Sequence, residues 1–300
     1  MRITLLILVF NNEAFIERTL LSILNNNTRH FDVVINDDNS IDSSVYIIEK
    51  FLKDYKEKTK KWRLNLNKVN LGINSSIKNI LEKDKNDWVK ILAGDDEFEQ
   101  DSLNEYYRLA GVSNSFSSIV LSDMSLINED SEFISKRKSL DPYFYENNFL
   151  KTTNFYLNTI NAPTVMIGRK NLLLALDKTK VKNLEDWPIL RFCVSRNFVF
   201  NICNKSLIKY RLHQNSLSSS YNSSAFSLKN KDKIRDQVEI LLNENKLMSK
   251  SFFVQFGIYL QLKILKTDSL LMQLFYKVLK LFNLQFCIFR LLSLLNVMRK

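Results

Sequence analysis

Two pairs of adjacent aspartates have the residue types and spacing for metal and nucleotide chemistry. Asp37 and Asp38 follow one apolar run, and Asp95 and Asp96 follow another, with Gly94 just before them. Adjacent carboxylates repel each other unless a cation lies beside them, and a hard divalent ion is their natural partner. A carboxylate can also accept hydrogen bonds from a nucleobase or from ribose hydroxyls. The second pair therefore predicts a site for a divalent cation that holds a diphosphate, and the first pair predicts contacts with a nucleobase or ribose.

Each pair also has an interpretation without a ligand. Asp37 and Asp38 could form an Asx turn that caps the helix expected after Asp42, and Asp95 and Asp96 could form an exposed turn. Both pairs follow expected strands, however, and open α/β sheets bind ligands at the carboxyl ends of their strands. This position favours binding for the second pair and leaves both interpretations open for the first.

The elements that would position these acids alternate along residues 1–217. Apolar residues recur with helical spacing from Ile16 to Leu24, and a second helix is expected after Asp42. Between the amphipathic stretches, strands are expected over residues 3–9, 32–36, 62–66, 88–92, 118–121 and 198–202. The alternation predicts an α/β domain with a mostly parallel, Rossmann-like sheet and flanking helices.

Residues 218–300 have a different character and follow a serine-rich linker. From Phe226 onward there are 13 Lys and Arg against 5 Asp and Glu, a surplus of 8 out of the net +11 of the chain. Lysines interrupt the apolar stretch 252–298 before it reaches the ~20 residues needed to span a bilayer. We expect a helical, basic amphipathic region that docks on anionic lipid, on the preceding domain or on a second copy of the chain.

Composition excludes several classes of protein. Three cysteines without a CxxC pair argue against a disulfide framework and fit a reducing cytosol. The apolar start, about eight residues long, predicts a buried strand and no signal peptide. Phe and Leu dominate the basic tail where a nucleic-acid groove would need Arg and Lys, so no nucleic-acid partner is expected.

Five ordered motifs between residue 3 and about residue 218 give the chain a resemblance to the family-2 GT-A glycosyltransferases. The two aspartate pairs belong to two of them. The others are Phe10-Asn11-Asn12-Glu13 with the first strand, Asn161-Ala162-Pro163-Thr164 followed by Glu185-Asp186-Trp187-Pro188, and Tyr210-Arg211-Leu212-His213. The segment Asn70-Leu71-Gly72 with Lys78-Asn79 lies between the aspartate pairs, as in that family.

The resemblance implies a donor site at the start of the chain. Phe10, Asn11 and Glu13 correspond to the first nucleotide-contacting loop, with the aromatic ring beside the base. Asp38 matches the position that hydrogen-bonds the base. Lys78 occupies the family's arginine position, which keeps the positive charge and loses the guanidinium fork.

The resemblance also implies a metal site with Mn²⁺ or Mg²⁺. Asp95 and Asp96 match the aspartate motif that contacts the ribose and the metal, with Asp96 as the expected direct ligand and Ala93 in place of the first aspartate. His213 is expected as a further metal ligand. Arg211 is expected to contact the diphosphate of the donor.

Asp186 is the expected general base, because the resemblance places the catalytic carboxylate of inverting members there. Glu185, Trp187 and Thr164 are expected on the acceptor side. Without the family, Glu185 and Asp186 would be interpreted as the acidic first turn of a helix.

The expected function is an inverting, metal-dependent transfer of a sugar from a nucleotide-diphosphate donor to an acceptor hydroxyl. The expected acceptor is a saccharide or lipid-linked saccharide in surface polysaccharide biosynthesis, and the expected location is cytoplasmic, with peripheral contact at the inner face of the membrane. A catalytically silent nucleotide-sugar-binding scaffold is the alternative that Ala93 and Lys78 favour. A nucleotidyltransferase would need a glycine-rich loop after the first strand, and residues 10–13 contain no glycine.

Overall fold

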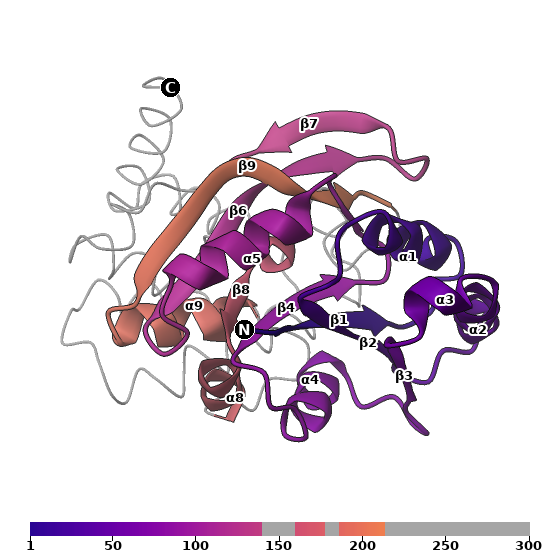
Figure 1. Cartoon of the computed structure of the whole chain (residues 1–300), viewed down its shortest axis with the longest axis horizontal. Coiled ribbons are helices and arrows are strands. Elements are labelled where there is room, and N and C mark those ends of the chain that lie inside the picture. The colour runs from indigo at the N-terminus through magenta and orange to yellow at the C-terminus, as the bar shows by residue number, and fades with distance from the viewer. Residues whose placement is uncertain (140–159, 178–185, 214–300) are drawn as a thin grey trace, which may run out of the picture.

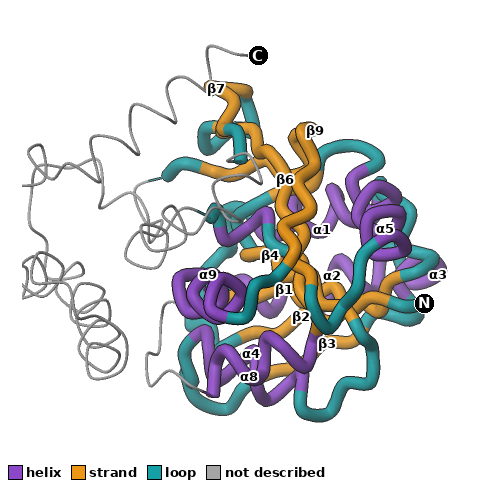
Figure 2. Tube along the Cα trace, turned by 90° about the vertical axis from the view of Figure 1, so that its left-hand side faces the viewer, coloured by secondary structure: helices purple, strands orange, loops and turns teal. Residues whose placement is uncertain are grey.

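The computed structural model describes residues 1–139, 160–177 and 186–213. In this part of the chain a nine-stranded sheet runs in the order β3-β2-β1-β4-β8-β6-β9-β5, with β7 paired to β6. Helices pack on both of its faces (Figures 1 and 2). The α/β fold with flanking helices is confirmed.

The first half of the sheet is parallel. β1 (Ile3–Val9) lies between β2 (Phe31–Asp37) and β4 (Trp88–Ala93), and β3 (Arg63–Leu66) forms the outer edge. These are four of the six strands expected from the sequence, and their ends differ from the expected ones by at most one residue. Their carboxyl ends therefore share one edge of the sheet.

The second half of the sheet is mixed. β6 (Ser118–Ile127) pairs in parallel with β9 (Val199–Arg211), and both strands extend well beyond the lengths expected from the sequence. Three strands that the sequence did not indicate pair antiparallel with their neighbours. They are β5 (Glu97–Phe98), β7 (Phe133–Arg137) and β8 (Met166–Gly168).

Two buried clusters lie on opposite faces of the sheet. Side chains of α1 (Ile16–Leu24), α2 (Ser44–Asp54) and α5 (Ser102–Val112) pack on one face, because alternate residues of each strand point to it. The other face packs against α4 (Ile73–Leu81), α8 (Arg169–Asp177) and α9 (Asp186–Ser195). The short elements α3 (Lys56–Thr59) and η1 (Ala162–Thr164) complete the described set.

The expectations for residues 218–300 fall outside the described residues. Among residues 1–139, 160–177 and 186–213, no helix combines the length and the apolar character that crossing a membrane requires.

Candidate active site

The loops that follow β1, β2 and β4 meet at the carboxyl edge of the sheet. The backbone N–H of Asp38 donates to the carbonyl of Val9 (2.9 Å), and that of Gly94 donates to the carbonyl of Leu8 (2.8 Å). A Cβ on Gly94 would lie 2.8 Å from Oδ1 of Asn12. The glycine therefore lets the acidic turn after β4 approach the loop after β1.

Asn11 and Glu13 join the first loop to the second. Oδ1 of Asn11 accepts from the backbone N–H of Ile41 (3.0 Å), and Oε2 of Glu13 accepts from that of Ser43 (2.9 Å). These two side chains, expected to contact the nucleotide, hold the loop after β2 in this structure. The Phe10 ring is 48% exposed at the same edge and is accessible to a ligand.

The Asp38 carboxylate fixes the segment that leads into α4. Asp38 is only 8% exposed, and its carboxylate accepts four hydrogen bonds. The donors are the backbone N–H groups of Leu71 and Gly72 and the side chains of Asn67 and Ser76. Three of these bonds end on Oδ1 and one on Oδ2, so most of the acceptor positions of the carboxylate are used within the protein. The base contact expected for Asp38 stays a prediction, and the structure adds a positioning role.

Lys78 does not extend freely toward a donor. Its Nζ forms an ion pair with Asp177 at the end of α8, and both side chains are partly exposed. Lys78, which occupies the arginine position of the family, thus joins α4 to α8. A phosphate contact would require it to leave this pair.

The two acids after β4 have different surroundings. Asp96 is 1% exposed, and its Oδ1 accepts from the backbone N–H of Arg211 (3.0 Å). Burial raises the pKa of its carboxyl well above the usual value, and the charge of Asp95 adds to the shift, whereas the Arg211 N–H and the Lys90 ammonium oppose it. Asp95 is less buried, and its Oδ2 lies 3.0 Å from Nε2 of His213.

The structure corrects the expected placement of His213, which lies against Asp95 and not against Asp96, because Asp96 turns inward and accepts from the backbone of Arg211. The metal contact expected for Asp96 stays a prediction. The Phe15 ring packs on the imidazole with 4.7 Å between the ring centroids. No signal in the sequence indicates this contact, because an aromatic residue just before an amphipathic helix usually packs in the hydrophobic core.

Arg211 is also corrected, because it is buried and fully bonded within the protein. Its five N–H donors bind the carbonyl oxygens of Asp95 (2.8 Å), Asn128 (2.9 Å) and Glu129 (2.9 Å), the carboxylate of Glu97 and the hydroxyl of Ser131. A guanidinium has five donors, so none is left for a diphosphate. Arg211 instead joins the acidic turn to the turn after β6.

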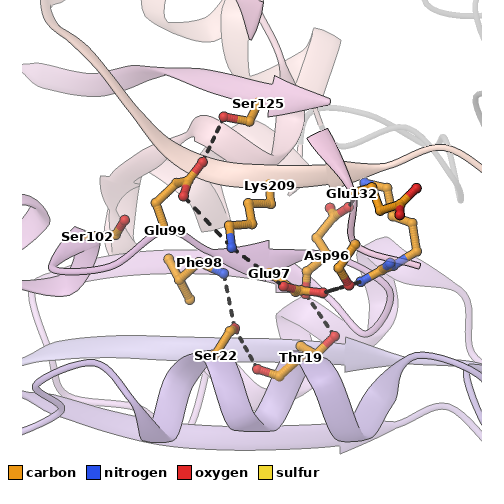
Figure 3. A network of polar contacts seen from close by, with 12 residues as sticks. Thr19, Ser22, Asp96, Glu97, Phe98, Glu99, Ser102, Ser125, Glu132 and Lys209 are labelled. Atoms are coloured by element: carbon orange, nitrogen blue, oxygen red, sulfur yellow. Dashed lines mark hydrogen bonds and ion pairs between the residues drawn. The ribbon is translucent and has the colours of Figure 1, made fainter. Parts of the chain in front are cut away.

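Polar contacts hold β5 beside this site. Lys209 lies 4.0 Å from Glu97 and 3.9 Å from Glu99, and the Ser125 hydroxyl donates to Glu99 (2.7 Å). Figure 3 shows these contacts above helix α1, where the backbone N–H of Phe98 donates to Ser22. An adjacent cavity of about 420 Å³ is lined by Glu97, Lys209 and neighbours from α1, and by none of the site residues expected from the sequence.

Thr164 is the third correction. Its side chain is fully buried, its hydroxyl donates to the carbonyl of Asn161 (2.8 Å), and its own carbonyl accepts from the Tyr106 hydroxyl (3.0 Å). It therefore stabilises the turn of residues 161–164 and is not accessible to an acceptor.

Asp186 is the first residue of α9 and is partly exposed. An acid there is stabilised by the helix dipole, as the helix-start interpretation anticipated. The following residues Ile189 and Leu190 pack in the cluster on the α4, α8 and α9 face. Glu185 and the side chain of Trp187 lie outside the described residues.

The fold is the GT-A fold, and comparison with solved structures agrees. The chain is similar to S. aureus TarS residues 1–349, solved in complex with UDP-GlcNAc, with 18% identity, a TM-score of 0.58, and coverage of 81% of this chain and 67% of that one. TarS 1–349 in complex with UDP gives 16% identity, a TM-score of 0.57, and coverage of 86% and 69%. At this identity the likeness concerns the fold alone. No protein of curated function matches the sequence.

The family follows from the sequence match. The profile described as Glycosyl transferase family 2 matches residues 4–173, more than half of the chain. The protein belongs to glycosyl transferase family 2.

Proposed function

We propose that this glycosyltransferase uses a nucleotide-diphosphate sugar as donor and transfers the sugar with inversion to an acceptor hydroxyl. The observation that carries the proposal is the meeting of Asp95 and His213 beside the loops after β1 and β2. This arrangement combines metal-ligating side chains with an exposed aromatic ring, Phe10, at the edge where α/β sheets bind nucleotides. The UDP-GlcNAc complex of TarS, which shares the fold, makes UDP-sugars the first donors to test.

A divalent cation fits the chemistry of Asp95 and His213. Carboxylate oxygen and imidazole nitrogen are ligands of Mn²⁺, and Mg²⁺ is often held by one or two carboxylates together with substrate phosphates. Within the described residues, no group of three His, Cys, Asp or Glu side chains is arranged as a metal site. Two protein ligands therefore suit a cation that completes its coordination with the donor diphosphate and water.

When bound, the cation would supply Lewis-acid stabilisation of the departing nucleoside diphosphate. Asp95 and His213 would hold it, while Arg211 fixes the backbone of Asp95. Asp186 would accept the proton of the acceptor hydroxyl as its oxygen attacks the anomeric carbon, which inverts the configuration in one displacement. We propose a saccharide or lipid-linked saccharide of a surface polysaccharide as the acceptor.

A donor screen tests the proposal. Thermal unfolding of the purified protein with Mn²⁺ and a panel of nucleotide-sugars should show a raised Tm with one nucleotide class, because a ligand that binds only the folded state stabilises it. The Asp95→Asn variant should lose most of that shift. If no nucleotide or nucleotide-sugar raises the Tm of the wild-type protein in Mn²⁺ or Mg²⁺, the proposed donor class is wrong.

The second candidate function is a silent nucleotide-sugar-binding protein. The pairing of Lys78 with Asp177 favours it, since this removes a cation from the donor side, as does Ala93 in place of an acid. Such a protein would show the Tm shift without release of nucleoside diphosphate from the donor. Slow donor hydrolysis in Mn²⁺ would exclude it.

A further inference from the structure

Lys90 is a lysine inside the apolar core. It lies in the middle of β4, between Leu5 of β1 and Met166 of β8, and its side chain is fully buried. Its neighbours on the same face of the strand, Trp88 and Leu92, belong to the cluster covered by α1 and α5. Burying an ammonium is costly unless it is paired and hydrogen-bonded, and an apolar residue would be the ordinary choice here.

The contacts of the ammonium join two separate segments. Nζ donates to the carbonyl of Ile91 (2.8 Å) in its own strand and to the carbonyl of Pro163, 73 residues further along the chain. The rings of Tyr106 and Phe98 lie under it, with 5.1 Å and 5.8 Å from Nζ to the ring centroids. These contacts satisfy the charge with groups that are all fixed by secondary structure.

One of the joined segments carries the acids of the site. Lys90 lies five residues before Asp95, and in its protonated form its charge stabilises the buried carboxylate of Asp96. The other segment is the turn of residues 161–164, which leads into β8. A second bond to this turn comes from α5, where the Tyr106 hydroxyl donates to the carbonyl of Thr164 (3.0 Å).

We propose that Lys90 is a positioning residue for glycosyl transfer, which fixes the acidic turn of residues 93–96 relative to the turn of residues 161–164. This inference rests on the proposed function. Lys90 touches no reacting atom in this account. It acts by holding these two turns in register, so its loss should lower the rate of transfer more than the affinity for donor.

Two substitutions separate this role from packing. Lys90→Met keeps the length and apolar stem of the side chain and removes every donor. Lys90→Gln loses the charge and keeps an N–H₂ group that can reach a carbonyl oxygen. Tyr106→Phe is the matched control, because it removes one bond to the same turn and leaves the charge beside Asp96 unchanged.

The test measures Tm, donor affinity, kcat and KM for transfer, and donor hydrolysis without acceptor. Lys90→Met should bind the donor within about threefold of wild type and lose about tenfold or more in kcat, with hydrolysis increased relative to transfer, since a small misplacement near the chemistry can cost on the order of a hundredfold. Lys90→Gln should lose less than Lys90→Met, and Tyr106→Phe less than either.

A Lys90→Met protein that transfers sugar with wild-type kcat would overturn the inference and leave the proposed function intact. If Lys90→Met does not fold, Lys90→Gln decides, and wild-type kcat there would also overturn it. If kcat falls only in proportion to the fall in Tm across the three variants, Lys90 would be assigned to packing alone. A wild-type protein that neither transfers nor hydrolyses any donor would overturn both proposals together.

Discussion

The imidazole Nε2 of His213 lies 3.0 Å from Oδ2 of Asp95, although the two residues are 118 positions apart. The contact depends on the end of β9 lying beside the acidic turn after β4, where Arg211 binds both the carbonyl of Asp95 and the carboxylate of Asp96 through its own N–H groups. The inner side of this turn is thus fixed, and its outer side presents one carboxylate and one imidazole.

Asp95 and His213 are predicted to act as metal ligands. His213→Asn and Asp95→Asn should each raise the Mn²⁺ concentration for half-maximal transfer by about tenfold or more, because each removes a proposed ligand. A metal titration of the transfer rate checks this. His30→Asn is the control, since His30 stacks on Tyr107 away from the acidic turn and should leave the titration unchanged. Unchanged titrations in both site variants would refute the ligand assignment.

Arg211 is predicted to support stability and not donor affinity. Arg211→Met removes the buried ion-pair partner of Glu97 and leaves Lys209, at 4.0 Å, as the cation beside it, so the free energy of unfolding should fall by about 3–5 kcal/mol. Urea unfolding measures the change. Arg108→Met removes an exposed pair with Glu105 and should change the free energy of unfolding far less, because water screens the pair. Similar losses in the two variants would contradict the description of Arg211.

Asp38 is predicted to hold the segment before α4. Asp38→Asn keeps one acceptor oxygen where the carboxylate has two, so the amides of Leu71 and Gly72 lose a charge-assisted partner worth about 1.5–3 kcal/mol. Their hydrogen exchange should accelerate, as measured by NMR, while amides in the centre of β1 keep their protection. Undiminished protection at Leu71 and Gly72 would show that other contacts fix the segment.

Lys90 should make stability depend on pH in a defined direction. Burial lowers its pKa to about 7 from 10.5, so between these values the unfolded chain holds a proton that the folded chain lacks. Stability from this group therefore rises with pH from about 7 to about 10.5, by up to about 1.4 kcal/mol per pH unit. Asp96 acts in the opposite sense at lower pH. Its pKa is raised in the folded protein, so the stability that its protonated form contributes is lost as the pH rises through that raised pKa.

Urea unfolding of wild type and Lys90→Met across this range checks the sign. The stability of wild type relative to the variant should increase with pH. Tyr106, which also faces Lys90, stays neutral in this window because burial raises its pKa. A difference that is flat or falls with pH would mean that Lys90 keeps its proton throughout.

The parallel half of the fold could be predicted from the sequence because most of its strands are apolar runs. β1, β2 and β4 are largely buried on both faces, so composition marks them, whereas the edge strand β3 is only partly buried. β5 and β8, with two and three residues, are too short to show any period. Their positions depend on the long strands that they join.

The direction of Arg211 could not be predicted, for a physical reason in β9. Alternation along a strand assigns each side chain to a face, but the pairing of β9 with β6 shifts register around Asp123. The sequence motif therefore marked Arg211 and His213 as site residues. The inward direction of the Arg211 side chain depends on the irregular pairing of β9 with β6, which the motif does not contain. Lys90 did have a signal in the sequence, as a lone charge within an apolar strand.

Asp186 is proposed as the base in transfer of a sugar from a nucleotide-diphosphate donor. The rate of nucleoside diphosphate release, measured with the donor that raises the Tm, acceptor and Mn²⁺, tests this role in wild type and Asp186→Asn. We predict acceptor-dependent release by wild type and a loss of about a hundredfold or more in the variant, with donor binding retained. Near-normal release by Asp186→Asn, or none by wild type with any donor that binds, would contradict the account.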